Sequence, residues 1–486
     1  MLKLYSLQSI ALASIAFLAG CATEPLETFK RHAMTITGDG DILAPNAGTE
    51  LLPSAGSQLT PLHEEQFAAY VDEMFTAVRG DERAKNLLIF VHGGLNTISS
   101  STGRSNALIE AFNRKELGDY YPLQINWDSG FFNTYKERLF KIRQGESKPL
   151  IAVASSPFYL SADLGRGIVR APIDIANTTY RDVQAIPWIQ QYANKFKVNS
   201  DLLYNAIKKD YSSNVSLGIK RPAGAQTFIK IPVNVLTWPF QLVLSPIIDA
   251  FGAPAWEEMQ RRAKVLYNKP QQFDIDMRED RIPAVLEGGP ASAMSLFAER
   301  LEAFCRDRPD AEVTLVGHSM GTFIINQMLR RYPTIRVNNI VYMAGADSIR
   351  NTFESVLPYM SLKGHEKTRF FNLTLHPQSE VEEVNYYFAP RGSLLVWITD
   401  FFSTPHTQFD RTVGRWEDII QAYGQIDSSL RHRVYIKAFD ETSKIAEHGD
   451  FARARFWKEE FWRPGEDNSN PWPKSGSAES GFYQMK

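Results

Sequence analysis

Glycine, histidine and serine occur together in the run Gly317-His318-Ser319-Met320-Gly321. The run directly follows the apolar residues 313–316 and precedes the helix-like residues 322–331. A serine at a sharp turn between a strand and a helix has a strained backbone, and bulk is excluded two residues before and after it, where both residues here are glycine. Its hydroxyl becomes a nucleophile when a neighbouring base removes the proton. We therefore predict that Ser319 attacks a carbonyl carbon.

The base that activates this serine must be chosen among nine histidines. His448 follows the strand expected over residues 433–439, and the Gly-Asp-Phe after it leads into an aromatic segment that could hold the loop in place. His432 precedes that strand and falls at the opposite edge of the sheet, and His406 lies in a loop rich in proline and threonine. Imidazole titrates near neutral pH, which suits it for proton transfer. His448 is the predicted base, and a histidine on a surface loop is the alternative.

A glycine pair lies upstream, where the strand expected over residues 86–91 ends in His92-Gly93-Gly94. Because these glycines carry no side chains, backbone N–H groups at the turn can approach a reacting carbonyl oxygen. An ordinary turn at the end of a strand would show the same residues. His92 and His318 flank the site, and we expect them to shape it rather than to transfer protons.

The order of glycine turn, serine, acid and histidine resembles that of the α/β-hydrolases of the esterase and lipase type. The resemblance extends over residues 86–462, with a long interruption. It implies an acyl-serine intermediate and an oxyanion hole formed by the N–H of Met320 and that of Gly93, with Gly94 as the alternative. A substrate does not follow from it, since thioester, amide or acyl-transfer chemistry would use the same groups as ester hydrolysis.

The acid in this family most commonly follows a later strand, which here matches the loop after the strand expected over residues 370–375. That loop reads His376-Pro-Gln-Ser-Glu380-Val-Glu382-Glu383. Glu380 is therefore the first candidate and Glu382 the second, while Asp347, after the preceding strand, is the third. Such an acid holds the imidazole in the correct tautomer and stabilises the imidazolium. A solvated acidic start of a helix would also account for the glutamates.

The elements that must position these residues alternate between strand and helix in residues 63–130 and 284–462. This alternation predicts the α/β class, with a mostly parallel sheet flanked by helices. Residues 131–283 lose the alternation and are interpreted as a large helical cap insertion. Its most apolar piece, residues 228–251, contains prolines and polar groups that argue against a membrane-spanning helix. We expect broken helices there, covering an acyl-binding cleft and touching the membrane surface.

The first residues have the pattern of a secretory leader, in which Lys3 precedes an apolar core too short to span a bilayer. Residues 1–20 end in Leu-Ala-Gly before Cys21, which resembles a bacterial lipobox whose cysteine is lipidated. An ordinary secretory leader is the alternative. Ala22 after the cysteine favours the outer membrane of a Gram-negative bacterium. Residues 21–62 are interpreted as a lipid anchor and tether, and residues 463–486 as a polar tail.

The composition of the whole chain is that of a globular protein, with 486 residues, 44% hydrophobic residues and a formal net charge of -2. Without a dense basic stretch, nucleic acid is not an expected partner. Metal-ligand motifs, phosphate loops and dinucleotide fingerprints are absent from the sequence, so we expect no cofactor and no metal. Cys305 lies on an apolar helical stripe and is expected to be an inert core thiol.

These features together favour a membrane-anchored serine hydrolase that cleaves carboxylic esters, because the apolar insertion and the tether would place an acyl site beside lipid. A non-catalytic envelope scaffold or binding protein with the same fold is the alternative function.

Overall fold

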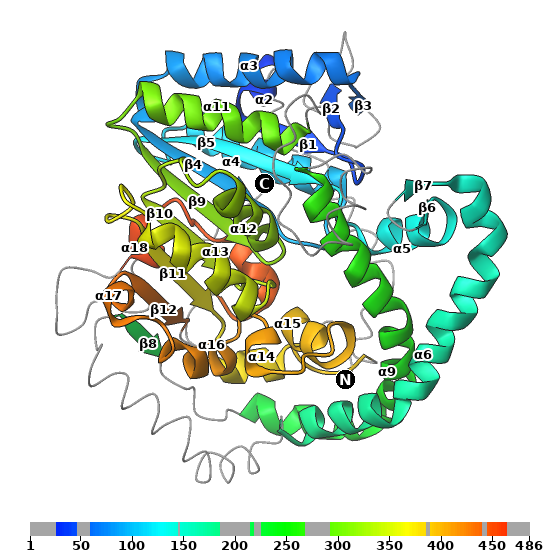
Figure 1. Cartoon of the computed structure of the whole chain (residues 1–486). Helices are drawn as coiled ribbons and strands as arrows, with labels where there is room; N and C mark the ends of the chain where they lie inside the picture. The colour runs from blue at the N-terminus through cyan, green and yellow to red at the C-terminus, as the bar shows by residue number, and fades with distance from the viewer. Residues whose placement is uncertain are drawn as a thin grey trace.

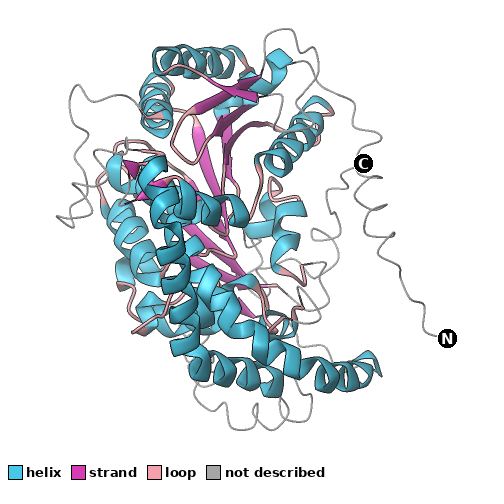
Figure 2. Cartoon of the chain, turned by 90° about the vertical axis from the view of Figure 1, so that its right-hand side faces the viewer, coloured by secondary structure: helices cyan, strands magenta, loops and turns pink. Residues whose placement is uncertain are grey.

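The chain folds around one large β-sheet with helices on both faces (Figures 1 and 2). The computed structural model describes residues 26–45, 59–143, 146–184, 214–217, 225–267, 292–384, 389–439 and 445–463. Across the sheet the ten strands follow the order β3-β2-β1-β5-β4-β9-β10-β11-β12-β8. The predictions for the leader, for Cys21 and for residues 464–486 lie outside the described residues.

Every neighbouring pair of strands from β1 to β8 in this order is parallel, and the pairs β1–β2 and β2–β3 are antiparallel. The predicted mostly parallel α/β architecture is thus confirmed. Because parallel strands share one direction, the carboxyl ends of β4, β9, β11 and β12 lie along the same edge. The bounds are β1 (Ala33–Ile36), β2 (Ile42–Pro45), β3 (Leu59–Pro61), β4 (Asn86–Val91), β5 (Tyr120–Trp127), β8 (Val215–Leu217), β9 (Glu312–His318), β10 (Asn339–Met343), β11 (Arg369–Thr374) and β12 (Val434–Ala438).

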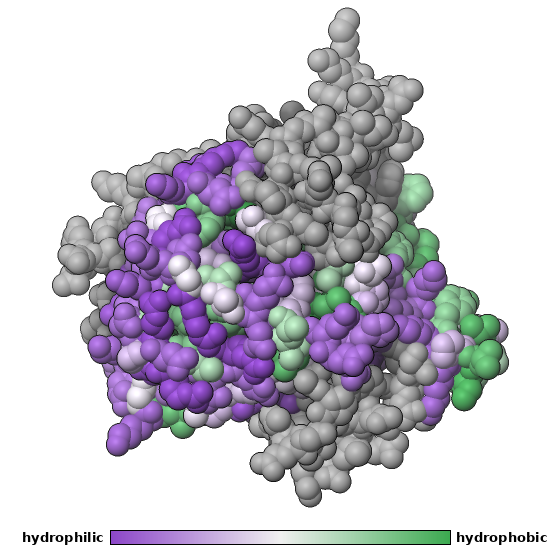
Figure 3. Space-filling view, turned by 90° about the horizontal axis from the view of Figure 1, so that it is seen from above, coloured by the Kyte–Doolittle hydropathy of each residue, from purple (hydrophilic) through white to green (hydrophobic). Residues whose placement is uncertain are grey.

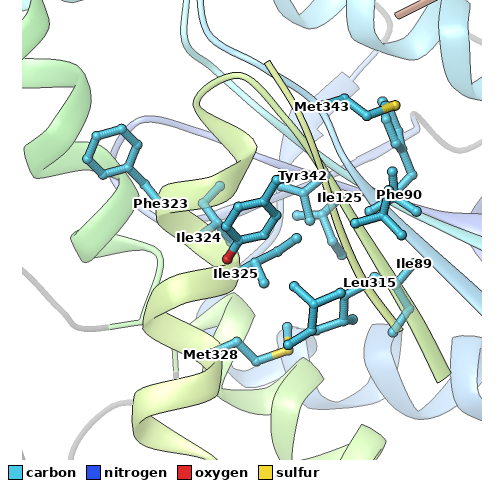
Figure 4. Packing of buried hydrophobic residues seen from close by; sticks show 14 of the residues in the cluster. Ile89, Phe90, Ile125, Leu315, Phe323, Ile324, Ile325, Met328, Tyr342 and Met343 are labelled. Atoms are coloured by element: carbon cyan, nitrogen blue, oxygen red, sulfur yellow. The ribbon is translucent and has the colours of Figure 1, made fainter. Parts of the chain in front are cut away.

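The helices α11 (Ala293–Asp307), α12 (Gly321–Arg331) and α13 (Ile349–Ser361) form a layer at one face of the sheet. From α12, Ile324, Ile325 and Met328 point toward Leu315 and Tyr342 of the sheet (Figure 4). The helix α3 (Glu64–Gly80) packs on α11 through rings of phenylalanine.

The other face carries α4 (Ile98–Asn113) and the short helix α18 (Glu459–Trp462). The hydroxyl of Ser105 in α4 donates to Gln124 of β5 at 3.1 Å. The ring of Trp462 packs edge-on against Phe371 of β11, with 4.8 Å between ring centroids. Buried apolar side chains on both faces thus fix the sheet between two helical layers.

The strands and helices expected around the candidate site are confirmed, and most of their ends lie within a few residues of the expected bounds. Two elements are longer than their sequence pattern indicates: α4 begins at Ile98, well before the mostly apolar residues 107–112, and β9 continues beyond residue 316 through His318. The α4 start is set by Thr97, whose hydroxyl accepts from the Ser100 N–H at 3.2 Å. This is an N-cap that the sequence reasoning overlooked.

The interpretation of residues 21–62 as a tether is wrong for the part that the structure describes. Helix α2 (Leu26–His32) packs against α3 and α4, and β1 pairs in parallel with β5. β2 and β3 then extend the sheet at its edge. Strands of three or four residues are too short to show a period of two, so no alternation in the sequence predicts them.

The insertion predicted over residues 131–283 is largely helical. It holds α5 (Phe131–Phe140), a two-stranded ribbon of β6 (Ile142–Arg143) and β7 (Glu146–Ser147), α6 (Pro149–Gln184) and α9 (Ala225–Val265). It also supplies β8, which pairs with β12, so it is not purely a helical cap. The expected broken helices are instead one continuous helix, α9, whose carboxyl-terminal part is buried in the core. Among the described helices none is long and apolar enough to span a membrane.

Shorter elements complete the chain, and most of them lie in its second half. They are η2 (Glu82–Lys85), α14 (Pro377–Glu382), α15 (Leu394–Trp397), η3 (Ile398–Phe402), η4 (Gln408–Asp410), α16 (Trp416–Tyr423), α17 (Ser428–Arg431) and η5 (His448–Arg453).

Candidate functional site

Ser319 occupies the sharp turn between β9 and α12. Its φ is +51°, in the left-handed region that residues with a side chain seldom adopt. The backbone is held there from both sides, because the Ser319 N–H donates to the Met343 carbonyl at 2.9 Å and the Ser319 carbonyl accepts from the Ala346 N–H at 3.0 Å. The serine is thereby fixed at the carboxyl edge of the sheet.

The glycines on either side of this serine lie where a side chain does not fit. A Cβ on Gly321 would come within 2.2 Å of the Val91 carbonyl oxygen, and a Cβ on Gly317 within 2.9 Å of Ile325 Cδ1. Both distances are shorter than van der Waals contact. The two glycines therefore let β4, β9 and α12 approach closely around Ser319.

His92, at the end of β4, is a neutral structural residue. Its Nε2 lies 3.0 Å from the Trp127 backbone N–H, which can only donate, so Nε2 accepts. The ring proton must then be on Nδ1, which donates to the Gly93 carbonyl at 2.7 Å. Burial lowers the pKa of His92 to about 3. His92 thus shapes the turn, as expected, and transfers no proton near neutral pH.

The turn after β4 packs directly on the serine. A Cβ on Gly93 would lie 2.6 Å from the Ser319 Cβ, and a Cβ on Gly94 2.5 Å from the Met320 Sδ. The Gly93 carbonyl is held by Asn96 and Ser129 as well as by His92. Among the hydrogen bonds of the described residues, none is donated by the backbone N–H of Gly93, Gly94 or Met320. Backbone donors are therefore available at the serine for an oxygen that gains negative charge.

His448 lies beside the residue that precedes the serine. Its carbonyl is 3.3 Å from His318 Nε2, and the two imidazole rings are 5.2 Å apart between centroids. Its side chain is buried, and burial lowers its pKa to about 4. Both ring nitrogens of His448, and the Ser319 hydroxyl, are buried without a hydrogen-bond partner among the described residues. His448 therefore packs beside His318, and no hydrogen bond joins its imidazole to the Ser319 hydroxyl.

The carboxylate that contacts His448 is Glu383, which the sequence reasoning did not assign. Its Oε2 accepts the backbone N–H of His448 at 2.9 Å. Burial, the largest cause, raises the pKa of Glu383 to about 8, although this hydrogen bond favours the ionised form. Glu383 is the last residue of the acidic loop 376–383. It lies about one helical turn beyond Glu380, and the spacing alone does not tell which of the two contacts the histidine.

Glu380 and Glu382 make other contacts. The hydroxyl of Ser393 donates to Glu380, whose carboxyl group also lies near the buried Arg415. Burial raises the pKa of Glu380 to about 7, against the effect of that arginine. The Gln378 amide donates to Glu382. The described contacts therefore place neither glutamate on the imidazole of His448.

Asp347, the third candidate acid, holds the helices behind the elbow together. One carboxylate oxygen accepts from the side-chain amides of Asn326 and Asn351, each at 2.7 Å, and the other accepts from the Ser348 N–H at 2.7 Å. Burial raises its pKa, and these donors oppose that shift. With its oxygens engaged in this way, Asp347 links α12 to α13.

Replacing Asp347 with alanine is therefore expected to weaken the fold. Buried donors in α12 and α13 lose their shared acceptor, and each unsatisfied donor costs about 1–3 kcal/mol. Urea denaturation followed by circular dichroism measures the free energy of unfolding. Asp307→Ala is the control, because Asp307 makes an exposed ion pair at 3.7 Å and should change stability little. Equal stability of both variants would contradict the structural role of Asp347.

Arg104 places a positive charge beside the site, and no pattern in the sequence marked it. Its guanidinium donates to the Asn96 side-chain oxygen, and its Nη1 is buried without a partner among the described residues. Burial is the largest cause of the lowered pKa values of His92 and His318, and the positive charge of Arg104 lowers both further. Arg104 also lines a mostly apolar pocket between α4 and the segment that ends at Trp457.

Other chemistries have no counterpart in the part of the chain that the structure describes. A group of three or more histidine, cysteine or acidic side chains able to hold a metal was not found there. Cys305 is buried, as expected for a core thiol, and burial raises the pKa of its thiol to about 11. The groups present suit attack by a hydroxyl on a carbonyl carbon, with proton transfer through an imidazole.

Residues 279–401 match a family model described as alpha/beta hydrolase fold. The match contains the Ser319 elbow and the loop with Glu380 and Glu383, and it ends before His448. Comparisons with curated proteins and with solved structures gave no match.

Proposed function

The chain has an α/β-hydrolase fold, and from this premise we propose that it is a serine hydrolase that cleaves carboxylic esters through an acyl-serine intermediate. The fold supports a hydrolase-type function. The observation that carries the finer proposal is that Ser319, at positive φ, packs against the glycine turn after β4, while His448 packs against His318, the residue before the serine. Backbone N–H groups that donate no hydrogen bond among the described residues lie at the same turn.

In the proposed reaction the Ser319 Oγ forms a bond to the ester carbonyl carbon while His448 accepts the hydroxyl proton. The carbonyl oxygen becomes an oxyanion and accepts hydrogen bonds from the Met320 N–H and from Gly93 or Gly94. The tetrahedral intermediate collapses, the bond to the alcohol oxygen breaks, and His448 returns the proton to the leaving alcohol. Water then attacks the acyl-serine by the same route, which releases the carboxylic acid and restores Ser319.

Substrate binding must rearrange the site before this reaction. Ser319 is 1% exposed and His448 6% exposed, and the atoms that would share the proton have no partner among the described residues. Movement of the imidazole toward the serine would satisfy both groups at once. Candidate catalytic contacts often tighten only when substrate binds.

Glu383 is the acid that we propose to orient His448. Its carboxylate already contacts the His448 backbone, whereas Glu380 contacts Ser393 and Asp347 contacts amides. An ionised carboxylate at this position stabilises the imidazolium that forms during attack. Glu380, the acid first predicted, remains the rival candidate.

Gly93→Ala is expected to lower kcat by about 10²–10³, because the new methyl group collides with the Ser319 Cβ and displaces the oxyanion donors. Gly94→Ala is the matched control. Its methyl group meets the flexible end of Met320, which can move aside, so a smaller loss is expected. Steady-state kinetics on a p-nitrophenyl ester measure both. A larger loss for Gly94→Ala would place the oxyanion hole elsewhere in the turn.

The proposed substrates are esters with an apolar acyl group, at the membrane where the predicted lipid on Cys21 would hold the enzyme. Apolar side chains near the site support an apolar acyl pocket there, since Phe90, Leu108, Phe456 and Trp457 gather beside Arg104. The lipobox-like sequence supports a cell-envelope location, facing lipid at the outer membrane of a Gram-negative bacterium.

Turnover of p-nitrophenyl esters of graded acyl length tests this proposal. The proposal expects hydrolysis of at least one ester in the series, with a preferred chain length set by the acyl pocket. The closed site, in which the catalytic hydrogen bonds are unmade, favours a non-catalytic scaffold as the second candidate. If no ester, thioester or amide in the series is cleaved by the folded protein, the scaffold replaces the enzyme.

A further inference from the structure

The outer surface of α6 is apolar along its whole length. Large apolar side chains are exposed at twelve positions of α6 and at four positions of the adjoining part of α9. In the space-filling view, hydrophobic residues gather at the right-hand margin, the side on which Figure 1 places α6 (Figure 3). The residues are Leu150, Ile151, Val153, Phe158, Leu160, Leu164, Ile168, Val169, Ile173, Ile175, Tyr180 and Val183 of α6, and Trp238, Phe240, Val243 and Ile247 of α9.

The charged residues of α6 all lie away from this surface. The helix contains six, and every one is buried or half-buried. They are Asp163, Arg166, Arg170, Asp174, Arg181 and Asp182. A helix on the surface of a water-soluble protein has the opposite arrangement, with its apolar stripe inward and its charges outward.

The adjoining part of α9 has the same inverted polarity, with polar side chains buried and apolar side chains exposed. Its buried positions recur every fourth residue, which is one stripe of a helix, and each carries a polar side chain. They are Thr237, Gln241, Ser245 and Asp249. This stripe faces α6, because α6 and α9 pack along each other and Arg166 of α6 donates to Asp249 at 2.8 Å.

Most of the polar groups on the inner side of α6 are paired with groups of α9 or η3, although both carboxyl oxygens of Asp174 have no hydrogen-bond partner among the described residues. Arg170 also contacts Asp249, and it lies 3.8 Å from Asp174. Farther along α6, Nε and Nη2 of Arg181 donate to the two carboxylate oxygens of Asp400 in η3, at 2.8 and 3.0 Å. Charged groups hidden from solvent are tolerated only when paired in this manner.

The two backbones also approach each other as helices in a bilayer do. Gly167 of α6 lies so near α9 that a Cβ there would be 2.4 Å from the Pro246 carbonyl oxygen. Small residues at the crossing, polar side chains between the helices and apolar side chains outside are the packing pattern of helices surrounded by lipid. An exposed apolar surface of this extent marks a site of interaction.

We propose that the outward surface of α6 and the adjoining part of α9, here called the α6–α9 surface, inserts into a lipid bilayer. Neither helix is suited to span the membrane, so the pair lies in the plane of the interface. The lipobox-like sequence at Cys21 supports lipid as the occupant, because it would hold the protein at a membrane. The proposal goes beyond ester hydrolysis and does not depend on it.

Because none of the charged residues of α6 is exposed, we expect membrane binding to depend little on the charge of the lipid. Attraction between basic residues and anionic lipids contributes little, so insertion depends on apolar burial. We expect the protein to bind phosphatidylcholine vesicles as well as vesicles that also contain phosphatidylglycerol, with little effect of salt.

Flotation with phosphatidylcholine vesicles tests the proposal on the chain beginning at Ala22, which lacks only the leader and the lipidated cysteine. The wild-type chain is expected to float with the vesicles. The triple variant Phe158→Lys, Ile168→Lys and Val169→Lys should lower the bound fraction by about tenfold or more, because three charges would enter the bilayer. These side chains are 72%, 74% and 79% exposed, so the folded protein should accommodate the change.

A second triple variant, Thr76→Lys, Leu362→Lys and Gln421→Lys, adds the same charge at exposed positions outside the α6–α9 surface and should still float. Three outcomes would overturn the proposal. The wild-type chain does not float; both triple variants float equally; or sedimentation shows a dimer that the first variant abolishes while no form binds vesicles, which would assign the surface to a second copy of the chain.

Discussion

Ser319→Ala and His448→Ala are each expected to reduce ester turnover by about 10⁴–10⁶, and the double variant by little more than either single one. The nucleophile and the base act as one unit, so the loss of either leaves only the oxyanion hole and substrate binding. The structure gives the reason to pair these two residues, since His448 lies beside His318, which directly precedes the serine.

Steady-state kinetics on the best p-nitrophenyl ester measure these losses. His406→Ala and His432→Ala are the controls, because both histidines are exposed and both were rejected on sequence position. They should retain wild-type turnover. Near-normal turnover of His448→Ala, or a comparable loss in either control, would remove His448 from the mechanism.

Glu383→Gln is expected to lower kcat by about 10⁴, whereas Glu380→Gln should leave most of the activity. Glutamine keeps the size of the side chain, so a loss at Glu383 would report the missing charge beside His448. Glu380 is directed to Ser393 instead, and its replacement acts on the packing of the α14–α15 loop. The opposite ranking of the two variants would restore Glu380 as the acid.

The dependence of kcat/KM on pH gives an independent reading of Glu383. Burial lowers the pKa of His448 to about 4 and raises that of Glu383 to about 8. Between these values the imidazole and the carboxyl group are both neutral. Above about pH 8 the carboxylate is ionised beside a neutral imidazole, which is the form that accepts a proton and stabilises the resulting imidazolium.

The wild-type kcat/KM is therefore expected to rise with pH toward 8 and beyond, and this rise should be missing in Glu383→Gln. Rates corrected for uncatalysed hydrolysis between pH 5 and 9 provide the profile. A wild-type profile that is level from pH 6 to 9 would contradict the assignment of the ionising group.

The central sheet and the elbow could be predicted from the sequence because their signals are local. Each parallel strand is a short apolar run, and the loop that follows it carries the polar residues. Gly317 and Gly321 mark the elbow because only a residue without a side chain fits there. The alternation predicts a parallel sheet but not its strand order, in which β1–β3 join one edge and β8 the other.

The inverted polarity of α6 could not be assigned from sequence. Its apolar residues recur at helical spacing, and the usual interpretation of that spacing is an inward apolar stripe. Which side of the helix faces the protein depends on Asp249 and Asp400, far away in the chain. Glu383 was not among the candidate acids for a similar reason, because its contact depends on where η5 places His448.

The most direct test of the central claim is covalent labelling with a fluorophosphonate, followed by mass spectrometry of the labelled peptide. Activated serine hydroxyls react with this reagent, whereas ordinary serines do not. The proposed chemistry predicts one adduct, on Ser319, that is absent from Ser319→Ala and strongly reduced in His448→Ala. An unlabelled wild-type protein, or an adduct on any other residue, would contradict it.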